Sequence, residues 1–338
     1  MSRDIAMKKV AWGVLSTAKI GMEKVTPALM RSQWCDVQAI ASRSLEGAQA
    51  AAGKLGIPKA YGSYEELLAD PSIEAIYNPL PNDQHVPLTL AAARAGKHVL
   101  CEKPIALTAD EAAQLREVAG KVHIMEAFMV RFHPQWLRTR ELVESGALGE
   151  VRAVQVWFSY FNRNATNIRN DASKGGGALM DIGCYPIVAG RFLFGTEPVR
   201  VMALADMDPD FGVDRTFSAL LDFGHGRRLD FTVSMQTTPY QRVQVIGTDK
   251  RVEIEIPFNA PQGHETRILV DDGKVLGGRE AVVETFAACD QYRLEGDAFS
   301  LAIRGVQPLQ YGVEDAIQNM RIIDALFASQ CTGAWVAV

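Results

Sequence analysis

Short, strongly apolar runs recur through the first third of the chain, and each is separated from the next by a stretch with helical periodicity. Most of these runs are rich in β-branched residues and lack polar–apolar alternation, which is typical of strands buried on both faces of a parallel sheet. Because such strands are joined by right-handed helical crossovers, the pattern predicts an α/β fold with a doubly wound sheet. The predicted strands are residues 8–15, 36–42, 73–78, 98–101 and 122–127.

The predicted helices of this region have recognisable starts. Residues 63–66 and 108–111 are S/T-x-x-E capping boxes, whose hydroxyl and glutamate satisfy amides that a helix start leaves unpaired. Further helices are predicted at residues 21–32, 46–55 and 84–95. The alternation therefore predicts an N-terminal Rossmann domain over residues 1–127.

After residue 131 the pattern changes to strands with a period of two. Residues 242–245 and 251–256 alternate polar and apolar side chains, which indicates antiparallel strands with one face on a core. Residues 223–227 and 271–274 contain the glycines that hairpin turns require. Two helices are predicted beside this sheet, at residues 134–145 and 313–329. Residues 128–338 are thus predicted to form an α+β domain with a large, mostly antiparallel sheet, which binds the substrate and mediates oligomerisation.

Length and charge limit the partners that the chain can have. Its 338 residues suggest two domains at roughly 150 residues each. A net charge of −5 and a pI near 5.8 give no general attraction for nucleic-acid phosphates. No apolar run approaches the ~20 residues that span a bilayer, and residues 1–9 lack the apolar core of a signal peptide. We therefore expect a cytoplasmic protein with no nucleic-acid or membrane partner.

The cysteines and histidines indicate neither a disulfide framework nor a metal site. The five cysteines are scattered, odd in number and contain no C-x-x-C pair. The six histidines form no H-E-x-x-H motif or close ligand cluster. We expect reduced thiols and no bound metal.

The loop after the first strand lies where a dinucleotide-binding fold holds a pyrophosphate. A G-x-G-x-x-G motif is typical there, but this loop begins with Ser16 and keeps only the third glycine, Gly21. Serine and alanine are still small enough for close backbone approach, and a helix start offers free N–H groups. On the motif alone, a plain strand-to-helix loop is an equally good interpretation. The predicted phosphate-side residues are Ser16, Thr17, Ala18 and Ile20.

The end of the second strand carries information on the cofactor. Enzymes that prefer NAD place an acid there for the ribose 2′-hydroxyl, whereas this chain has Ser42, Arg43 and Ser44. An arginine flanked by hydroxyls suits a 2′-phosphate through charge-assisted hydrogen bonds. The alternative is a solvated surface arginine. We predict NADP as the preferred cofactor, with NAD possible.

Two further loops follow predicted strands at the edge where doubly wound sheets bind ligands. The first contains a Pro-Asn-x-x-His motif that ends at His85, and the second contains Glu102, Lys103 and Pro104. A lysine at the end of a parallel strand is unusual for a purely structural position. The cofactor-binding residues predicted in these loops are Pro79, Leu80, Pro81, Asn82, His85, Glu102 and Lys103.

With these motifs, the chain resembles the glucose–fructose oxidoreductase, inositol dehydrogenase and rhizopine catabolism (Gfo/Idh/MocA) family over nearly its full length. Residues 126–135, 167–169 and 175–186 are similar to the branch that contains dimeric dihydrodiol dehydrogenases and NADP-dependent D-xylose dehydrogenases. Many other members of the family have histidine at the position of Tyr185. This departure argues against an inositol dehydrogenase.

The resemblance implies an active site in the cleft between two domains, with Lys103, Asp181 and Tyr185 as its catalytic residues. A phenol with a pKa of ~10 needs a neighbouring cation to act as a base at neutral pH. Tyr185 with Lys103 as electrostatic partner meets that need, although the lysine can itself be the acid–base group. Asp181 is expected to bind a sugar hydroxyl or orient the lysine. Lys103, Asp181 and Tyr185 are also predicted to bind the substrate, together with Arg131 and Arg169, and Arg169 is predicted to contact the nicotinamide as well.

The predicted activity is NADP-dependent hydride transfer between the nicotinamide and a sugar or polyol-like alcohol, with an aldose such as D-xylose, oxidised at C1, as the first candidate. Oxidation of a trans-dihydrodiol and reduction of a keto-sugar are alternative reactions that use the same mechanism. A non-catalytic NADP-binding regulator and elimination chemistry with a retained cofactor are alternatives of a different class. The family resemblance also implies a homodimer or homotetramer.

Overall fold

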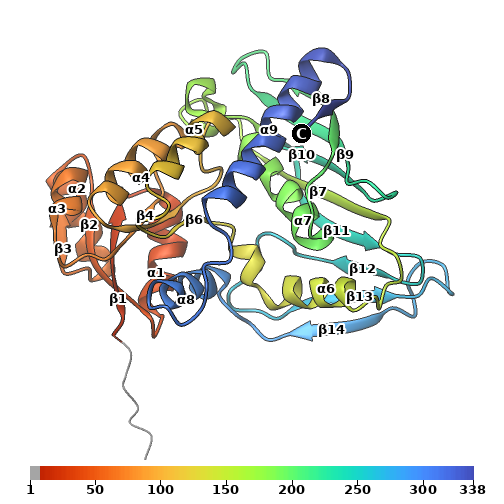
Figure 1. The fold of residues 1–338 in the computed structure, drawn as a ribbon, viewed down its shortest axis with the longest axis horizontal. Helices are drawn as coiled ribbons and strands as arrows, with labels where there is room; N and C mark the ends of the chain where they lie inside the picture. The colour runs from red at the N-terminus through yellow and green to blue at the C-terminus, as the bar shows by residue number, and fades with distance from the viewer. Residues whose placement is uncertain (1–7) are drawn as a thin grey trace, which may run out of the picture. The chain divides into compact units, whose positions relative to one another are not determined.

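The structure is a computed structural model that describes residues 8–338, and these residues form two compact units (Figure 1). Unit 1 comprises residues 8–106, 110–129 and 292–316, and unit 2 comprises residues 107–109, 130–291 and 317–338. This division differs from the predicted domains 1–127 and 128–338, because residues 292–316 belong to unit 1. Residues 1–7, which include most of the segment used to predict the absence of a signal peptide, lie outside the described residues.

Unit 1 is built on a six-stranded parallel sheet with the order β3-β2-β1-β4-β5-β6, which confirms the predicted doubly wound architecture. Its strands are β1 (Val10–Leu15), β2 (Cys35–Ala41), β3 (Lys59–Tyr61), β4 (Ala75–Asn78), β5 (His98–Cys101) and β6 (Ile124–Glu126). Its longer helices are α2 (Leu45–Leu55), α3 (Tyr64–Ala69), α4 (His85–Arg94) and α8 (Gln291–Ile303). The predicted helix 21–32 is a π-helical turn (Gly21–Val25) followed by α1 (Thr26–Met30).

Helix α8 belongs to unit 1 because it completes the core on which β1 packs. Trp12 is fully buried, its ring centroid lies 5.7 Å from that of Phe299, and its indole N–H donates to Ser300 Oγ at 3.2 Å. A Cβ at Gly296 would lie 2.2 Å from Leu29 Cδ2, so any larger residue would displace the Leu29 side chain where α8 approaches α1. Nothing in the apolar pattern of residues 291–303 indicates that they join the N-terminal sheet.

Unit 2 is built on a nine-stranded sheet with the order β14-β13-β12-β11-β7-β10-β9-β8-β15. All neighbouring pairs are antiparallel except β7 and β10, which run parallel, so the sheet is mostly antiparallel as predicted. Residues 223–227 connect the antiparallel neighbours β9 and β10, which confirms the first predicted hairpin turn. The predicted turn at 271–274 is the start of a longer connection, residues 272–281, between the antiparallel strands β13 and β14. The strands are β7 (Ala153–Phe161), β8 (Arg200–Met207), β9 (Asp214–Asp222), β10 (Arg228–Ser234), β11 (Gln236–Ile246), β12 (Arg251–Ile254), β13 (Thr266–Asp271), β14 (Val282–Phe286) and β15 (Val336–Ala337).

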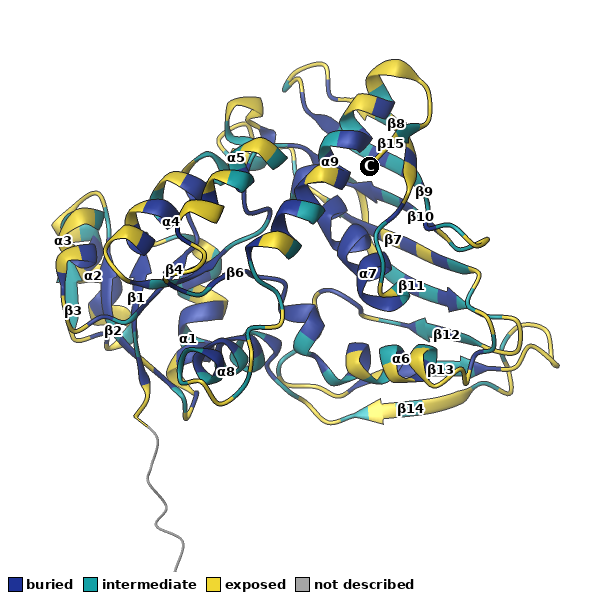
Figure 2. Cartoon of the chain, in the orientation of Figure 1, coloured by how far each residue is buried: buried dark blue, intermediate teal, exposed yellow. Residues whose placement is uncertain are grey.

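Helices α6 (Pro134–Glu144) and α7 (Cys184–Phe194) contact each other and pack on this sheet. Almost all of α7 is buried (Figure 2). In the segment 172–194, which includes Lys174, Asp181 and Arg191, one 18-residue window has a mean hydropathy of 1.2, enough for a membrane span by length and composition alone. However, 94% of that window is buried inside the protein, so its apolar character is that of a core helix. Helix α9 (Val313–Thr332) precedes the C-terminal strand.

Candidate functional site

The turn after β1 has an unusual backbone at the position of the missing first glycine. Ser16 has φ +73°, a conformation that residues other than glycine rarely adopt. Its amide donates to Ala41 O at 2.8 Å, and its hydroxyl accepts from Ala18 N at 3.2 Å. The side chain therefore stabilises the turn that glycine would form without strain. The helical turn that follows at Gly21–Val25 presents its N-terminal end to this loop.

The segment after β2 combines a helix start with an exposed cation. Ser44 is the N-cap of α2, and its hydroxyl accepts from Gly47 N at 3.0 Å. Arg43 is exposed and makes no ion pair with any acid in the part of the chain that the structure describes. A guanidinium without an acidic partner, beside a helix N-terminus, is suited to an anionic ligand group.

The loop after β4 is fixed by a buried amide. The side chain of Asn78, which is fully buried, donates through Nδ2 to His85 O at 3.2 Å. Its Oδ1 accepts from Leu80 N at 3.3 Å. Asn78, at the end of β4, therefore binds the backbone of this loop at two points, Leu80 and His85.

His85 joins this loop to the loop after β5. It is 1% exposed, and its Nδ1 and Nε2 lie 2.7 Å from Pro104 O and Leu80 O, respectively. Burial lowers the pKa of His85, although both carbonyls favour the protonated ring. Because burial lowers its pKa, the His85 ring is neutral at pH 7. Its single N–H then donates to only one of the two carbonyls at a time. His85 thus positions the two loops, and the predicted contact with the nicotinamide stays a prediction.

The backbone around Lys103 is also held on both sides. Glu102 Oε1 accepts from the hydroxyl of the buried Tyr77 at 2.6 Å. Burial and, secondarily, the Glu102 carboxylate hold the pKa of Tyr77 well above its ordinary value. On the other side, Ile105 N donates to Glu126 Oε1 at 2.8 Å. Lys103 is half-buried between these anchors.

The four loops considered so far follow β1, β2, β4 and β5, which are neighbours in one parallel sheet. The carboxyl ends of parallel strands share one edge, and the strand order reverses direction between β1 and β4. The predicted cofactor-binding residues of unit 1 therefore lie along the edge where such sheets hold dinucleotides.

In unit 2, the glycine-rich segment wraps tightly around the backbone of residues 169–171. A Cβ at Gly176 would lie 2.5 Å from Arg169 O and 2.8 Å from Asp171 O. Gly177 has φ +115°, and a Cβ there would collide with the carboxylate of Asp214. Any side chain at these two positions would displace Arg169 or Asp214, so both positions require glycine.

Asp214 holds the start of the helical segment that carries two of the predicted catalytic residues. It is 3% exposed, and its Oδ2 accepts from Leu179 N at 2.7 Å. Burial raises the pKa of Asp214 to about 7 although the backbone N–H groups favour the carboxylate. No sequence motif indicates a role for this residue, because Asp214 lies 33 positions from Asp181 in the chain.

Asp181 is the centre of a polar network within unit 2. Its Oδ1 accepts from Arg169 Nε at 2.8 Å, and its Oδ2 accepts from Tyr160 OH at 2.5 Å. Burial and, secondarily, the Asp181 carboxylate raise the pKa of Tyr160 far above its ordinary range, so Tyr160 stays a donor. The structure thus brings the predicted Asp181 and Arg169 together. It adds Tyr160, which lies with Trp157 and Phe158 in one strand. The sequence predicts sheet packing for these aromatic residues, with a ring that faces the sugar as the alternative.

Tyr185 lies four residues after Asp181. Asp181 belongs to a π-helical turn at Leu179–Gly183, and Tyr185 lies in the first turn of α7, which follows directly. Single π-helical turns inside helices are frequent at functional sites. Tyr185 is 7% exposed, and its ring packs edge-on against Phe158 at 5.8 Å and obliquely against Phe258 at 5.3 Å. The contacts with Phe158 and Phe258 therefore hold the Tyr185 ring in one orientation.

Arg131, the last predicted substrate contact, lies in a short 3-10 helix (Met129–Phe132) and is 3% exposed. The neighbouring His133 caps α6 by accepting from Gln135 N at 3.2 Å, and burial lowers its pKa to about 4. The predicted role of Arg131 in substrate binding stays a prediction. Within residues 8–338, no group of three or more histidine, cysteine or acidic side chains could hold a metal ion.

Comparison with known proteins matches both halves of the chain to families. Residues 10–131 match an oxidoreductase family with an NAD-binding Rossmann fold, and residues 136–253 match the Gfo/Idh/MocA C-terminal domain. The chain is 45% identical to an uncharacterized oxidoreductase of Rhizobium meliloti, over 98% of this chain and all of that one. It is 43% identical to a D-xylose 1-dehydrogenase (NADP(+)) of Haloferax volcanii, over 96% of this chain and 98% of that one.

Among solved structures, the chain is similar to KijD10, a 3-ketoreductase of Actinomadura kijaniata in complex with NADP and TDP-benzene. The TM-score is 0.88 at 28% identity, and the match covers 95% of this chain and 98% of that one.

Proposed function

Because the chain belongs to the Gfo/Idh/MocA family of oxidoreductases, we propose that it transfers a hydride between NADP and an alcohol carbon of a sugar. The first candidate reaction is oxidation of an aldose such as D-xylose at C1, which gives the lactone. The observation that carries this choice is the 43% identity, over nearly the whole of both chains, to a D-xylose 1-dehydrogenase that uses NADP(+).

The residues of unit 1 fit this cofactor. The backbone of the turn at Ser16, Thr17, Ala18 and Ile20 offers N–H groups for a pyrophosphate at a helix start. Arg43, with no acidic partner in residues 8–338, offers a guanidinium for a 2′-phosphate, flanked by Ser42 and Ser44. The nicotinamide-side residues are Pro79, Leu80, Pro81, Asn82, His85, Glu102, Lys103 and Arg169. When bound, NADP supplies the hydride acceptor.

The protein's own contribution is to move a proton and to align the substrate. Oxidation of an alcohol releases the hydroxyl proton to a base while the carbinol C–H leaves as hydride. We assign proton transfer to Tyr185, whose ring direction is fixed by Phe158 and Phe258, with the Lys103 ammonium as its electrostatic partner. Asp181 holds a sugar hydroxyl, because the hydrogen bonds from Arg169 and Tyr160 fix both of its oxygens in place.

The test of this assignment is a substrate panel: D-xylose, D-glucose and an aromatic dihydrodiol with NADP, and 1,5-anhydrofructose with NADPH. Turnover of D-xylose is expected, and no turnover of any member would refute a sugar or diol oxidoreductase. Lys103→Met is expected to abolish turnover while NADP still binds, as measured by fluorescence titration, whereas Lys121→Met, on the exposed surface of unit 1, is the control. Unchanged turnover in Lys103→Met would remove the lysine from the mechanism. If Tyr185→Phe keeps turnover and Lys103→Met loses it, the lysine is the acid–base group.

Reduction of a keto-sugar is the second candidate, and the observation that favours it is the structural similarity to a 3-ketoreductase. It uses the same groups in the opposite direction, with Tyr185 as the proton donor. Faster NADPH oxidation with 1,5-anhydrofructose than NADP reduction with any aldose would favour this candidate.

We further propose a homo-oligomer formed through the outward face of the sheet in unit 2. Leu204, Ser218, Thr232 and Trp157 are register partners in one row across β8, β9, β10 and β7. Leu204 is 74% exposed and Trp157 is 41% exposed, so large apolar side chains lie open on this row. Analytical ultracentrifugation is expected to show a dimer or tetramer that Leu204→Asp weakens. A monomeric wild-type protein would refute the proposal.

A further inference from the structure

Tyr77 is a buried tyrosine of β4 that the chemistry assigned above does not use. Its neighbour in the strand, Asn78, bonds to the start of α4, and successive side chains of a strand point to opposite faces of a sheet. Tyr77 therefore points to the other face, in register with Val14 of β1. Trp12, two residues before Val14, points to the same face and meets Phe299 of α8. Tyr77 thus lies on the face that α8 covers, and it is 0% exposed.

The ring of Tyr77 lies against the turn to which the pyrophosphate is assigned. A Cβ placed at Gly21 would lie 3.5 Å from Tyr77 Cε1 and 3.5 Å from Pro79 Cγ, which are ordinary van der Waals distances. Gly21 is the buried first residue of the π-helical turn that follows β1. The Tyr77 ring therefore fills the space next to the helix start whose N–H groups are assigned to the cofactor.

The hydroxyl of Tyr77 holds the loop that carries Lys103. It donates to Glu102 Oε1 at 2.6 Å, and Glu102 Oε2 accepts from Lys103 N at 3.4 Å. The backbone of Glu102 is held as well, because its N–H donates to Asn78 O at 3.0 Å. The carboxylate of Glu102 therefore links a side chain that is fixed in the sheet to the backbone from which Lys103 extends.

Tyr77 keeps its proton in this position. Burial and, secondarily, the nearby carboxylates of Glu102 and Glu295 hold the pKa of Tyr77 well above its ordinary value. Glu295 belongs to α8 and is 1% exposed, so this second carboxylate is buried with the phenol. A phenol that stays protonated remains a hydrogen-bond donor to Glu102 at neutral pH.

From these contacts we propose that Tyr77 is a positioning residue: its ring supports the phosphate-binding turn, and its hydroxyl, acting through Glu102, sets the position of Lys103. The inference rests on the proposed function and adds to it a buried residue that acts through its neighbours. One side chain then serves both the binding of the cofactor and the alignment of the proton-transfer groups. A displacement of about 1 Å in such a group can slow the chemical step by about a hundredfold.

Two substitutions at Tyr77 separate the ring from the hydroxyl. Tyr77→Phe keeps the ring, so we expect kcat with the fastest substrate of the panel to fall about tenfold while the Kd of NADP changes by less than about twofold. Tyr77→Leu loses the ring as well, so we expect at least the same fall in kcat and a Kd of NADP that is about tenfold higher. Steady-state kinetics and fluorescence titration with NADP measure the two quantities.

Glu102→Gln tests whether the hydroxyl acts through Glu102. The amide has one oxygen for the two donors, Tyr77 OH and Lys103 N, so kcat is expected to fall in this variant too. The double variant Tyr77→Phe/Glu102→Gln is expected to stay within about twofold of the slower single variant, because both changes break the same chain of bonds. If Tyr77→Phe does not fold, wild-type kcat in Glu102→Gln would overturn the proposal by itself.

Tyr61→Phe is the matched control in the same sheet. Tyr61 lies in β3, and its hydroxyl donates to Asp70 Oδ2 at 2.8 Å, so this variant also loses a bond from a phenol to a carboxylate. It is expected to lower the melting temperature and to keep kcat within about twofold of wild type.

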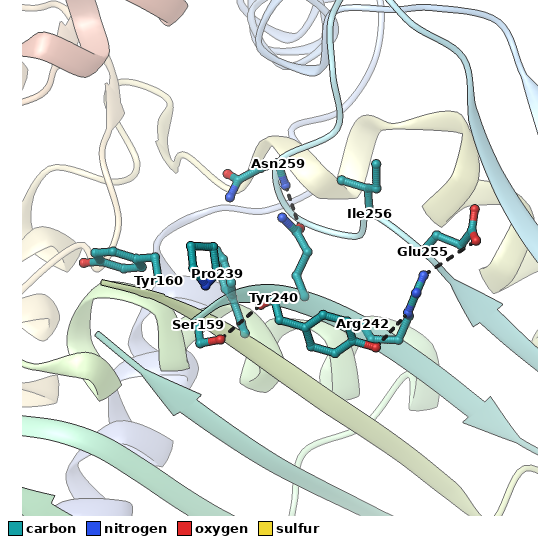
Figure 3. A pocket seen from close by; sticks show the side chains of 10 residues that line it. Ser159, Tyr160, Pro239, Tyr240, Arg242, Glu255, Ile256 and Asn259 are labelled. Carbon is teal, nitrogen blue, oxygen red and sulfur yellow. Dashed lines mark hydrogen bonds and ion pairs between the residues drawn. The ribbon is translucent and has the colours of Figure 1, made fainter. Parts of the chain in front are cut away.

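Tyr240→Phe is a second control, in unit 2. Tyr240 lines a pocket, where its hydroxyl accepts from Arg242 at 3.2 Å (Figure 3). It pairs with Ser159, two residues after Trp157, and so lies on the outward face of the sheet. This variant is expected to change neither kcat nor the Kd of NADP by more than about twofold.

Wild-type kcat in Tyr77→Phe, or a fall no larger than that in Tyr61→Phe, would overturn the proposal. An equal loss of NADP affinity in Tyr77→Phe and Tyr77→Leu would also overturn it, because the ring would then contribute nothing of its own. Multiplied effects in the double variant would show that Tyr77 and Glu102 act independently. If the wild-type protein turns over no member of the panel, the proposed function itself fails, while the two Kd values still test the role of the ring.

Discussion

The carboxyl group of Asp214 makes the stability of this protein depend on pH in an uncommon direction. Burial raises its pKa from 3.8 to about 7 in the folded chain. The folded state therefore holds a proton that the unfolded state releases between pH 4 and pH 7. Since stability falls with rising pH wherever the folded state binds more protons, this group lowers the free energy of unfolding across that window. At 1.36 kcal/mol per pKa unit, the full loss is about 4 kcal/mol.

The substitution that isolates this effect is Asp214→Asn, which keeps the shape and can still accept from Leu179 N. We expect the difference in unfolding free energy between variant and wild type to shift in favour of the variant by up to about 4 kcal/mol between pH 4 and pH 8. Altered hydrogen bonds in the variant can add a constant difference of about 1–3 kcal/mol, but this difference does not change with pH and leaves the pH-dependent shift unaffected. Urea-induced unfolding, followed by tryptophan fluorescence at half-unit pH steps, measures it.

Asp222→Asn is the matched control for this experiment. Hydrogen bonds from Gly224 N and Arg200 hold the pKa of Asp222 below its ordinary value, so its contribution is lost only at more acidic pH. The control difference is therefore expected to stay flat from pH 4.5 to pH 8. A flat difference for Asp214→Asn as well would refute the assignment of a raised pKa to this buried carboxyl group.

Three further substitutions test individual contacts. Ser16→Val keeps the strained φ of +73° but loses the bond to Ala18 N, so we expect a loss of about 1–3 kcal/mol in stability and a weaker NADP affinity, whereas Ser16→Gly should bind NADP normally. Tyr160→Phe removes the bond to Asp181 and is expected to lower kcat/KM about tenfold with NADP affinity unchanged; an equal fall in NADP affinity would contradict a substrate-side role. Gly176→Ala places a Cβ 2.5 Å from Arg169 O and is expected to lower both the melting temperature and kcat/KM, and a variant with wild-type kinetics would show that the loop position is unimportant.

The architecture could be predicted because local patterns determine it. Parallel strands buried on both faces and strands with a period of two differ in their apolar spacing, and both predicted sheets are confirmed. The return of α8 to unit 1 was not predictable in this way. It depends on Phe299 and Ser300 meeting Trp12, nearly 290 residues earlier, and on a glycine at position 296. Periodicity shows that a helix has an apolar face but not which sheet receives it.

The same limit applies to the candidate site. Loops at the ends of β4 and β5 could be predicted because the end of a parallel strand is a defined place for ligands. The bonds that Asp181 makes to Arg169 and Tyr160 join three separate segments, and their pairing depends on the packing of the helical segment 179–183 on β7. The positive φ of Ser16 is likewise set by the turn and not by the residue type.

If the hydride passes from a sugar carbon to NADP without exchange with water, D-[1-²H]xylose transfers its deuterium to the cofactor. The oxidation is run with NADP, and the reduced cofactor is analysed by mass spectrometry and ¹H NMR. One deuterium is expected at C4 of the nicotinamide for each lactone formed, in wild-type protein and not in Lys103→Met. Lactone formation without deuterium in the cofactor, or no reduced cofactor with any sugar or diol of the panel, would contradict this transfer.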